Sequence, residues 1–207
     1  MLTPVLRRAS AALAGAVALM LVGTATGSAV PAPDQGPTAG GTLVSSSLDG
    51  PTFTDISTGY FHSLGIGSDG QTYAWGDGSG GRLGTGNTSN SLTPVPVSTP
   101  PGVTFTLVST ESSHSLALGS DGQTYAWGTG SGGQLGTGNT SDALVPVPVS
   151  TPVGVTFTAI STAALHSLAL GSDGQAYTWG TGSYGQLGTG NTSTALAPVL
   201  VSSPPGV

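Results

Sequence analysis

The 207-residue sequence contains no cysteine. Disulfide bonds, thiol catalysis and thiolate metal sites are therefore excluded, and stability must come from packing and sheet hydrogen bonds. Charge is also scarce, with three basic residues against nine acidic ones. Proteins that bind nucleic acid neutralise its phosphates with Lys and Arg. The composition therefore argues against nucleic acid as a partner, and equally against an anionic membrane surface.

Long stretches without glycine or proline are missing as well. The chain has 35 Gly and 15 Pro, and in residues 52–207 they leave no uninterrupted window longer than 16 residues. β-branched and aromatic residues dominate the apolar positions there, which favours strands. The sequence therefore predicts an all-β fold.

The first residues have the pattern of a targeting signal. Arg7 and Arg8 precede an apolar run over residues 11–22, and small residues follow as far as Ala29. This pattern predicts a secretory signal peptide over residues 1–29 and an extracellular, secreted protein. Alternative cleavage sites are Ala25 and Ala32. The competing interpretation is an uncleaved membrane anchor, although the apolar run is short for a span of about 20 residues.

Residues 30–51 are rich in Pro, Gly, Ser and Thr and show no strand or helix period. They predict a flexible leader, although residues 42–45 could instead add an outer strand to the following unit. Without the signal, Arg82 is the only basic residue against nine acidic ones, a formal charge of −8. No membrane contact is expected after cleavage.

The rest of the chain repeats one pattern three times. His62, His114 and His166 lie 52 residues apart, and the same spacing separates three tryptophans, Trp75, Trp127 and Trp179. A period of this length indicates a solenoid, propeller or array. The three units span residues 52–103, 104–155 and 156–207. Residues present in every copy, including these His and Trp, are interpreted as structural.

Each unit contains four strand signals. In the middle unit they lie at residues 105–110, 114–118, 123–127 and 145–149. Asp121-Gly122 separates the second and third signals and is typical of a tight hairpin turn. The fourth alternates Val with Pro, so it belongs at the edge of a sheet. Four short antiparallel strands in about 50 residues indicate a propeller blade.

The repeated runs also resemble a known family. His-Ser-Leu-Ala-Leu from His114, Asp-Gly-Gln-Thr-Tyr-Ala-Trp-Gly from Asp121, and Gly-Gln-Leu-Gly-Thr-Gly from Gly133 are similar to the regulator of chromosome condensation repeat. The resemblance covers residues 52–207. It implies a β-propeller, usually of seven four-stranded blades, that acts as a protein-interaction platform.

Three repeats predict an incomplete, open propeller with two exposed flanks. Two explanations remain for the missing blades. The chain is either part of a longer reading frame, or a short protein that completes a ring by self-association.

Motifs that resemble catalytic or metal sites are better explained by the fold. His114 and Ser115 are adjacent on one strand and so point to opposite faces, while Asp121 lies in a turn. Equivalent His residues lie a sheet spacing of about 10 Å apart, too far to share one zinc ion. The Gly-x-Gly-x-x-Gly run from Gly128 does not open a helix and so cannot cradle a dinucleotide. No enzyme activity, cofactor or metal is expected.

Positions that differ between copies are the candidates for partner binding. Loop residues connect the strands at the ends of a propeller, where such folds bind. Aromatic residues and Arg are enriched at binding hot spots. The candidates are Tyr60, Phe61, Asp77, Arg82, Glu111, Leu165 and Tyr184. Neutral drift after duplication of the repeat is the alternative explanation for these differences.

The function predicted from these observations is a secreted, non-enzymatic repeat module that binds a macromolecule, most readily a protein, with a glycan as the other option. Three alternatives stay open. The chain could be a fragment of a larger surface or adhesion propeller, or an extracellular enzyme inhibitor. Guanine-nucleotide exchange is the family's best-known activity, but a secretion signal would separate the chain from cytosolic GTPases.

Overall fold

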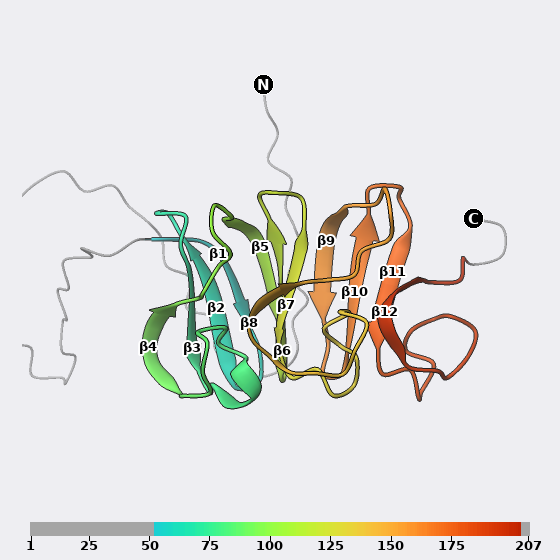
Figure 1. The fold of residues 1–207 in the computed structure, drawn as a ribbon, viewed down its shortest axis with the longest axis horizontal. Helices are drawn as coiled ribbons and strands as arrows, with labels where there is room; N and C mark the ends of the chain where they lie inside the picture. Colours follow the sequence, from blue (N-terminus) through green and yellow to red (C-terminus); the bar gives the residue numbers. More distant parts are fainter. Residues whose placement is uncertain (1–51, 204–207) are drawn as a thin grey trace, which may run out of the picture. The chain divides into compact units, whose positions relative to one another are not determined.

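The computed structural model describes residues 52–203. The predicted signal peptide (1–29) and leader (30–51) lie outside this range, as do residues 204–207. Within it the chain forms twelve strands in three four-stranded antiparallel sheets, and the only helical segment is the short 3₁₀ turn η1 (Ser79–Gly81) (Figure 1). Residues 52–203 include no helix with the length and apolar character needed to cross a membrane.

The three sheets share one plan, in which strands consecutive in sequence are neighbours in the sheet. The first consists of β1 (Phe53–Thr58), β2 (His62–Gly67), β3 (Thr72–Gly76) and β4 (Ser91–Pro96). The second consists of β5 (Phe105–Thr110), β6 (His114–Gly119), β7 (Thr124–Gly128) and β8 (Ala143–Pro148). The third consists of β9 (Phe157–Thr162), β10 (His166–Gly171), β11 (Ala176–Gly180) and β12 (Ala195–Leu200).

The hairpin between β6 and β7 shows why the Asp-Gly pair recurs. Gly122 has a φ of +81°, a backbone conformation that residues with a side chain rarely adopt. The Asp121 carboxylate accepts the backbone N–H of Gln123 at 3.1 Å and the hydroxyl of Tyr125 at 2.7 Å. One side chain thus fixes both the turn and the first large residue of the next strand. The same pair of bonds forms from Asp69 and from Asp173.

The Val-Pro segment lies at a sheet edge, as the sequence predicts. β8 pairs only with β7, with Tyr125 opposite Pro148 and Ala126 opposite Val147. The outer edge of β8 has no neighbouring strand in its sheet, so no backbone N–H is required to donate a hydrogen bond there and prolines are tolerated. β4 and β12 occupy the same place in their own sheets.

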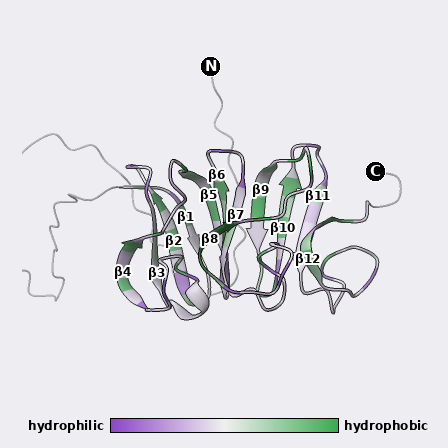
Figure 2. Cartoon of the chain, viewed as in Figure 1, coloured by the Kyte–Doolittle hydropathy of each residue, from purple (hydrophilic) through white to green (hydrophobic). Residues whose placement is uncertain are grey.

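Neighbouring sheets pack face to face, and the apolar core lies between them. Green apolar segments in Figure 2 lie mainly on strands, whereas the turns are pale or purple. Each sheet has a leading face, which carries its Phe and Trp and meets the preceding sheet, and a trailing face, which carries its Leu and His. In the second sheet the rings of Phe105 and Trp127 stack on the leading face at 5.7 Å, and both side chains are buried.

Among residues 52–203, only the middle sheet has both faces covered by other sheets. On the leading face, Phe105 is 2% exposed but its first-sheet equivalent Phe53 is 42% exposed. On the trailing face, Leu64 and Leu116 are fully buried, whereas Leu168 of the third sheet is 37% exposed. The propeller is therefore open. This confirms the predicted fold class of three tandem blades that form an incomplete propeller.

Candidate binding surface

The junction between two sheets is built around a backbone carbonyl. The indole Nε1–H of Trp127 donates to the carbonyl of Arg82 at 2.9 Å, and the Ser115 hydroxyl donates to the same oxygen at 3.2 Å. At the next junction Trp179 and Ser167 both donate to the carbonyl of Gln134, each at 2.9 Å. Both lone pairs of one buried oxygen are thus used by the following sheet, which satisfies the acceptor fully.

The repeated His completes this junction. His62 Nε2 lies 2.9 Å from the hydroxyl of Ser115, and His114 Nε2 lies 2.8 Å from Ser167 in the next sheet. Since the Ser115 proton points to the Arg82 carbonyl, its oxygen accepts from a neutral histidine that carries its proton on Nε2. Each of these two histidines thus bonds to a hydroxyl group of the neighbouring sheet, Ser115 and Thr110 for His62 and Ser167 for His114.

Burial keeps these histidines neutral. It lowers the pKa of His114 to about 3 and that of His62 to about 4, with the nearby Arg82 charge adding to the effect on His62. The Nδ1 atoms of both residues have no hydrogen-bond partner within residues 52–203. A nucleophilic triad needs a carboxylate there and a serine open to substrate. Neither requirement is met, since Ser115 is buried within the junction.

The predicted binding residues gather at one end of the sheets. In an antiparallel sheet the first and third connections lie at the same end, and the Asp-Gly turns lie at the other. Tyr60 and Phe61 belong to the β1–β2 connection, and Leu165 to the equivalent β9–β10 connection. We call this end of the sheets the loop end. The remaining candidates in the connections on this end are Asp77, Arg82, Glu111 and Tyr184.

Two aromatic rings dominate the loop end of the first sheet. Tyr60 is 78% exposed and Phe61 55% exposed, and their rings meet edge to face with centroids 5.0 Å apart. The guanidinium carbon of Arg82 lies 5.6 Å from the centroid of the Phe61 ring, within the range of a cation–π contact. We call Tyr60, Phe61 and Arg82 the aromatic cluster.

Arg82 supports this surface and does not present its charge to solvent. It is only 8% exposed. Its Nε donates to the Ser79 carbonyl at 2.8 Å, and Nη1 donates to the Ser112 carbonyl at 3.1 Å and pairs with Asp77 at 3.1 Å. Hydrogen bonds from Ser79, and then the Arg82 charge, hold the pKa of Asp77 below its usual range. The guanidinium therefore ties the glycine loop of the first sheet to the second sheet.

The backbone beside the cluster is also held in place. The Tyr60 N–H donates to the Glu111 carbonyl at 2.7 Å, so the β1–β2 turn is fastened to the next sheet. A Cβ at Gly59 would lie 1.7 Å from that oxygen, which only glycine avoids. Glu111 thus contributes through its backbone. No local sequence pattern predicts this contact, because it joins residues about 50 positions apart.

The other two candidates stand apart from the cluster, in the third sheet. Leu165 is 50% exposed at the position equivalent to Phe61, and Tyr184 is 93% exposed in the glycine loop. No contact between either residue and the aromatic cluster is found in the described range. The structure therefore brings together Tyr60, Phe61, Asp77, Arg82 and Glu111, and leaves Leu165 and Tyr184 as separate exposed side chains.

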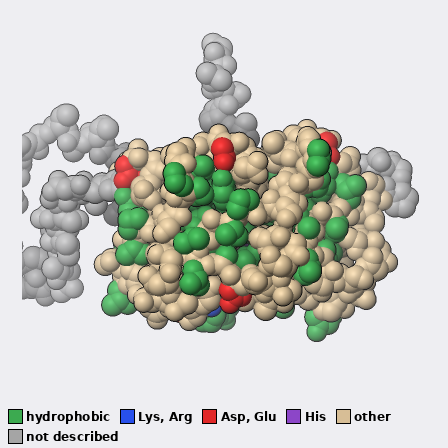
Figure 3. Space-filling view, viewed as in Figure 1, with side chains coloured by type: hydrophobic (Ala, Val, Ile, Leu, Met, Phe, Trp, Pro, Cys, Tyr) green, Lys and Arg blue, Asp and Glu red, His purple; other side chains and the backbone are tan. Residues whose placement is uncertain are grey.

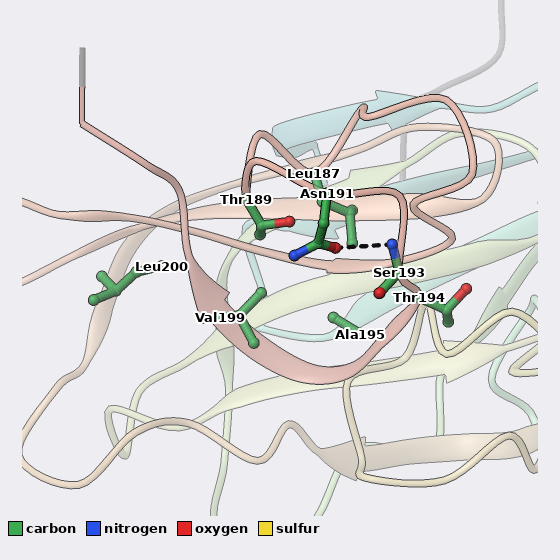
Figure 4. Close-up of a pocket in the computed structure, with 8 residues that line it drawn as sticks. All are labelled: Leu187, Thr189, Asn191, Ser193, Thr194, Ala195, Val199 and Leu200. Carbon is green, nitrogen blue, oxygen red and sulfur yellow. Dashed lines mark hydrogen bonds between the residues drawn. The ribbon is translucent and has the colours of Figure 1, made fainter. Parts of the chain in front are cut away.

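A hollow that the sequence did not signal lies beneath β12. It has a volume of about 330 Å³, and Figure 4 shows Leu187, Asn191 and Val199 among the side chains that line it. Asn191 Oδ1 accepts the Ser193 N–H at 2.8 Å, the dashed bond in the figure. A smaller hollow of about 210 Å³ occupies the same place in the second sheet. Its recurrence and the lack of charged side chains in the larger one identify it as part of the unit's framework.

Comparison with protein families places the repeat securely. The model of the regulator of chromosome condensation (RCC1) repeat matches residues 69–118, 121–170 and 173–207, and a second RCC1 model matches 53–82 and 157–186. The first two matched segments begin at or near an Asp-Gly turn and end in the second strand of the next sheet. Each of these family units therefore spans one sheet junction.

Individual relatives agree with this assignment. The ultraviolet-B receptor UVR8 of Arabidopsis thaliana is 36% identical over 162 residues, which are 78% of this chain and 37% of UVR8. The human E3 ubiquitin-protein ligase HERC2 is 37% identical over 138 residues, 66% of this chain and 3% of that protein. The chain thus spans well under half the length of these relatives.

Solved structures show the same fold. Human WBSCR16 superposes with a TM-score of 0.66 at 23% identity, over 75% of this chain and 39% of that one. Prp20p from Saccharomyces cerevisiae superposes with a TM-score of 0.66 at 20% identity, over 73% and 38%. With the repeat matched over most of residues 53–207, the chain belongs to the regulator of chromosome condensation (RCC1) repeat family.

Proposed function

We propose that this chain is a secreted, non-enzymatic module that binds another protein through the aromatic cluster at the loop end. The observation that carries the proposal is the geometry of Tyr60 and Phe61. Both rings are largely exposed, yet they pack on each other and, through Phe61, on a buried Arg82. Rigid exposed aromatic side chains supply contact area at little cost in conformational entropy, as hot-spot residues do.

The surroundings of the cluster favour a partner without strong negative charge. The chain carries nine acidic residues and a formal net charge of −6. In Figure 3 the charged side chains on the visible face are few and nearly all acidic. Like charges across an interface oppose association, whereas a neutral or basic partner is tolerated or attracted.

Proteins with this fold support protein binding as the class of activity. The structure of Prp20p was reported together with its binding to Gsp1p and histones, and yeast RCC1 (Prp20) has been solved bound to Kap60. These partners belong to those proteins. For this chain they indicate only that a propeller of this type can act as a protein-binding platform.

The binding test replaces both rings at once. A Tyr60→Ala/Phe61→Ala variant should lose binding to proteins captured by the wild-type chain from culture supernatant, quantified by mass spectrometry and then by titration of the purified partner. A loss of at least tenfold in affinity is expected when two hot-spot side chains are removed, at about 1–2 kcal/mol each.

The matched control is Val153→Ala. Val153 is fully exposed and lies in the β8–β9 connection, at the opposite end of the sheets. Unchanged capture by the double variant, or an equal loss with Val153→Ala, would refute the proposed surface. Treatment of the captured material with glycosidases distinguishes a glycan from a protein partner.

Secretion is tested separately. Expression of the full chain in a host with a general secretory pathway should release a protein whose N-terminus lies after Ala29. Terminal sequencing of the released protein measures this directly. Retention of residues 1–29 in a membrane fraction would favour the anchor instead.

A further inference from the structure

The two open faces of the propeller are the two halves of one junction. The trailing face of the first sheet bonds to the leading face of the second through Ser57, His62 and the carbonyl of Arg82. The leading face of the second sheet supplies the Thr110 N–H, the Ser115 hydroxyl and the Trp127 indole. Between the second and third sheets the equivalent groups form the same three bonds.

The trailing face of the third sheet keeps the half of this set that receives the next sheet. Ser161, His166 and the carbonyl of Gln186 stand where Ser109, His114 and the Gln134 carbonyl stand one sheet earlier, each 52 residues on. The Ser161 side chain is exposed and His166 is partly exposed, whereas His114 is fully buried. The trailing face of the third sheet therefore carries the polar groups that match a further leading face.

The leading face of the first sheet keeps the donating half. Thr58, Ser63 and Trp75 are identical in type to Thr110, Ser115 and Trp127. The apolar positions match as well, because Phe53 is equivalent to the buried Phe105. The side chain of Ile56 is 66% exposed, whereas Val108 at the equivalent position is 5% exposed. The first sheet therefore begins with the face that the third sheet lacks.

An apolar hollow marks the place where the missing face would pack. It has a volume of about 210 Å³ on the trailing face of the third sheet, and Ala159, Ser161, Leu168 and Leu170 are among the residues that line it. Leu116, the second-sheet equivalent of Leu168, is fully buried. A leading face of the same repeat would therefore close this hollow.

We propose that a second copy of this chain docks there, with the leading face of its first sheet on the trailing face of the third sheet of the other copy. The contact is head to tail. Such a contact closes into a ring if the rotation per unit permits, and continues into a chain of copies if it does not. Two copies would supply six blades, within the range of about four to eight that propellers use. This surface is separate from the aromatic cluster, so each proposal can fail alone.

The absence of cysteine allows a direct test. In the junction of the second and third sheets the hydroxyls of Ser109 and Thr162 are 3.0 Å apart. Thiols at these two positions would lie within reach of a disulfide. The equivalent positions across two copies are Ser161 and Thr58. A full chain with Ser161→Cys and a second full chain with Thr58→Cys should therefore cross-link to each other under mild oxidation.

The expected product is a species of twice the 20.0 kDa chain mass, seen on a non-reducing gel only when the two variants are mixed. The positive control is Ser109→Cys/Thr162→Cys, which should form its disulfide within one chain and so show that the junction geometry and oxidant are adequate. Near-ultraviolet circular dichroism of the tryptophans confirms that each variant is folded.

Two outcomes overturn the proposal. One is a mixture that stays at the mass of one chain while the positive control closes completely, as expected if another segment or another protein covers these faces. The other is equal dimer formation by either variant alone, which indicates random contact. Light scattering provides a second measurement. The associated fraction of the Trp75→Ala variant should be at least tenfold lower than that of the wild-type chain. The Tyr184→Ala variant should associate as the wild-type chain does.

Discussion

At the scale of single residues, the serine after each histidine carries the contact between sheets. Ser115 accepts from His62 and donates to the Arg82 carbonyl, and it is fully buried. Removing its oxygen takes one hydrogen bond from the Arg82 carbonyl and one from the His62 imidazole, whose Nε2 then keeps only the Thr110 hydroxyl as a partner. The loss of two buried hydrogen bonds costs about 1–3 kcal/mol. The sequence showed His and Ser as neighbours, but each pairs with a residue 53 positions away, and no local pattern reveals that.

Ser115→Ala is therefore expected to lower the free energy of unfolding by about 1–3 kcal/mol. Ser63→Ala is the matched control, because Ser63 has the same place in the first sheet and the described residues form no sheet that precedes it. Its effect should be near zero. Urea denaturation at high dilution, where copies do not associate, measures both. Equal losses for the two variants would contradict the account of the junction.

Acid should destabilise the protein through the buried histidines. The pKa values of His62 and His114 are about 4 and about 3 in the folded chain, against about 6.5 when unfolded. Between these values the unfolded chain binds more protons, so the free energy of unfolding falls as pH decreases from about 6.5 towards 4. Above about pH 6.5 this contribution is fully present. Arg82 and Asp77 are the charged groups that influence His62.

Urea denaturation at intervals from pH 7.5 to 4 measures this slope. A His114→Asn variant should be less stable at neutral pH but should show a shallower pH dependence. A wild-type stability that stays constant down to pH 4 would contradict the prediction. Loss confined to pH below 4 would assign the acid sensitivity to carboxylates such as Asp69, whose pKa is lowered chiefly by its bond from Tyr73.

At the scale of elements, the strands were predictable and the loops were not. The Asp121-Gly122 turn and the alternation of Leu116 and Leu118 are local signals, and β6 and β7 form at the predicted positions. The sequence also favoured Arg82 as a loop residue that binds a partner. Its burial follows from Phe61 and the second sheet, which approach it only after the sheets have packed.

The glycine loop after each third strand fits against the next tryptophan. Gly136 has a φ of +67°, and a Cβ there would lie 2.7 Å from Trp179 Nε1. Gly188 has a similar φ of +63° but no tryptophan against it among the described residues. The left-handed backbone alone costs a side chain about 1–2 kcal/mol.

Gly136→Ala should thus destabilise the protein more than Gly188→Ala. Both carry the backbone cost. The added Cβ at Gly188 would meet only Val201 Cγ1, at 3.0 Å, whereas at Gly136 it would press on the buried Trp179 ring, which adds overpacking of about 1–3 kcal/mol. Thermal denaturation of the two variants gives the difference directly. If the two variants lose the same stability, the contact with Trp179 is not a constraint on this loop.

At the scale of the whole molecule, stability is expected to be uneven. Repeat proteins gain stability from each unit and from each contact between neighbours. The middle sheet has two junctions, and each outer sheet has one. Local opening should therefore be rarest in the centre.

Hydrogen exchange should show this gradient. Amides of β6 and β7 are expected to exchange at least tenfold more slowly than their equivalents in β2, β3, β10 and β11 at high dilution. Mass spectrometry of peptic fragments can resolve the three sheets. Fastest exchange in β6 and β7 would be incompatible with the packing described. As concentration rises, head-to-tail docking should bring the outer sheets towards the protection of the middle one.

The acceptor at each junction is a peptide oxygen, and this has an evolutionary consequence. No substitution can delete a main-chain carbonyl, so the side chain at that position can change while the junction persists. Arginine occupies it in the first unit and glutamine in the next two. A duplicated unit therefore inherits a working attachment point that does not depend on which side chain stands at that position. New contacts, such as those of Arg82 with Ser112 and Asp77, can arise there by mutation while the carbonyl continues to hold the next sheet.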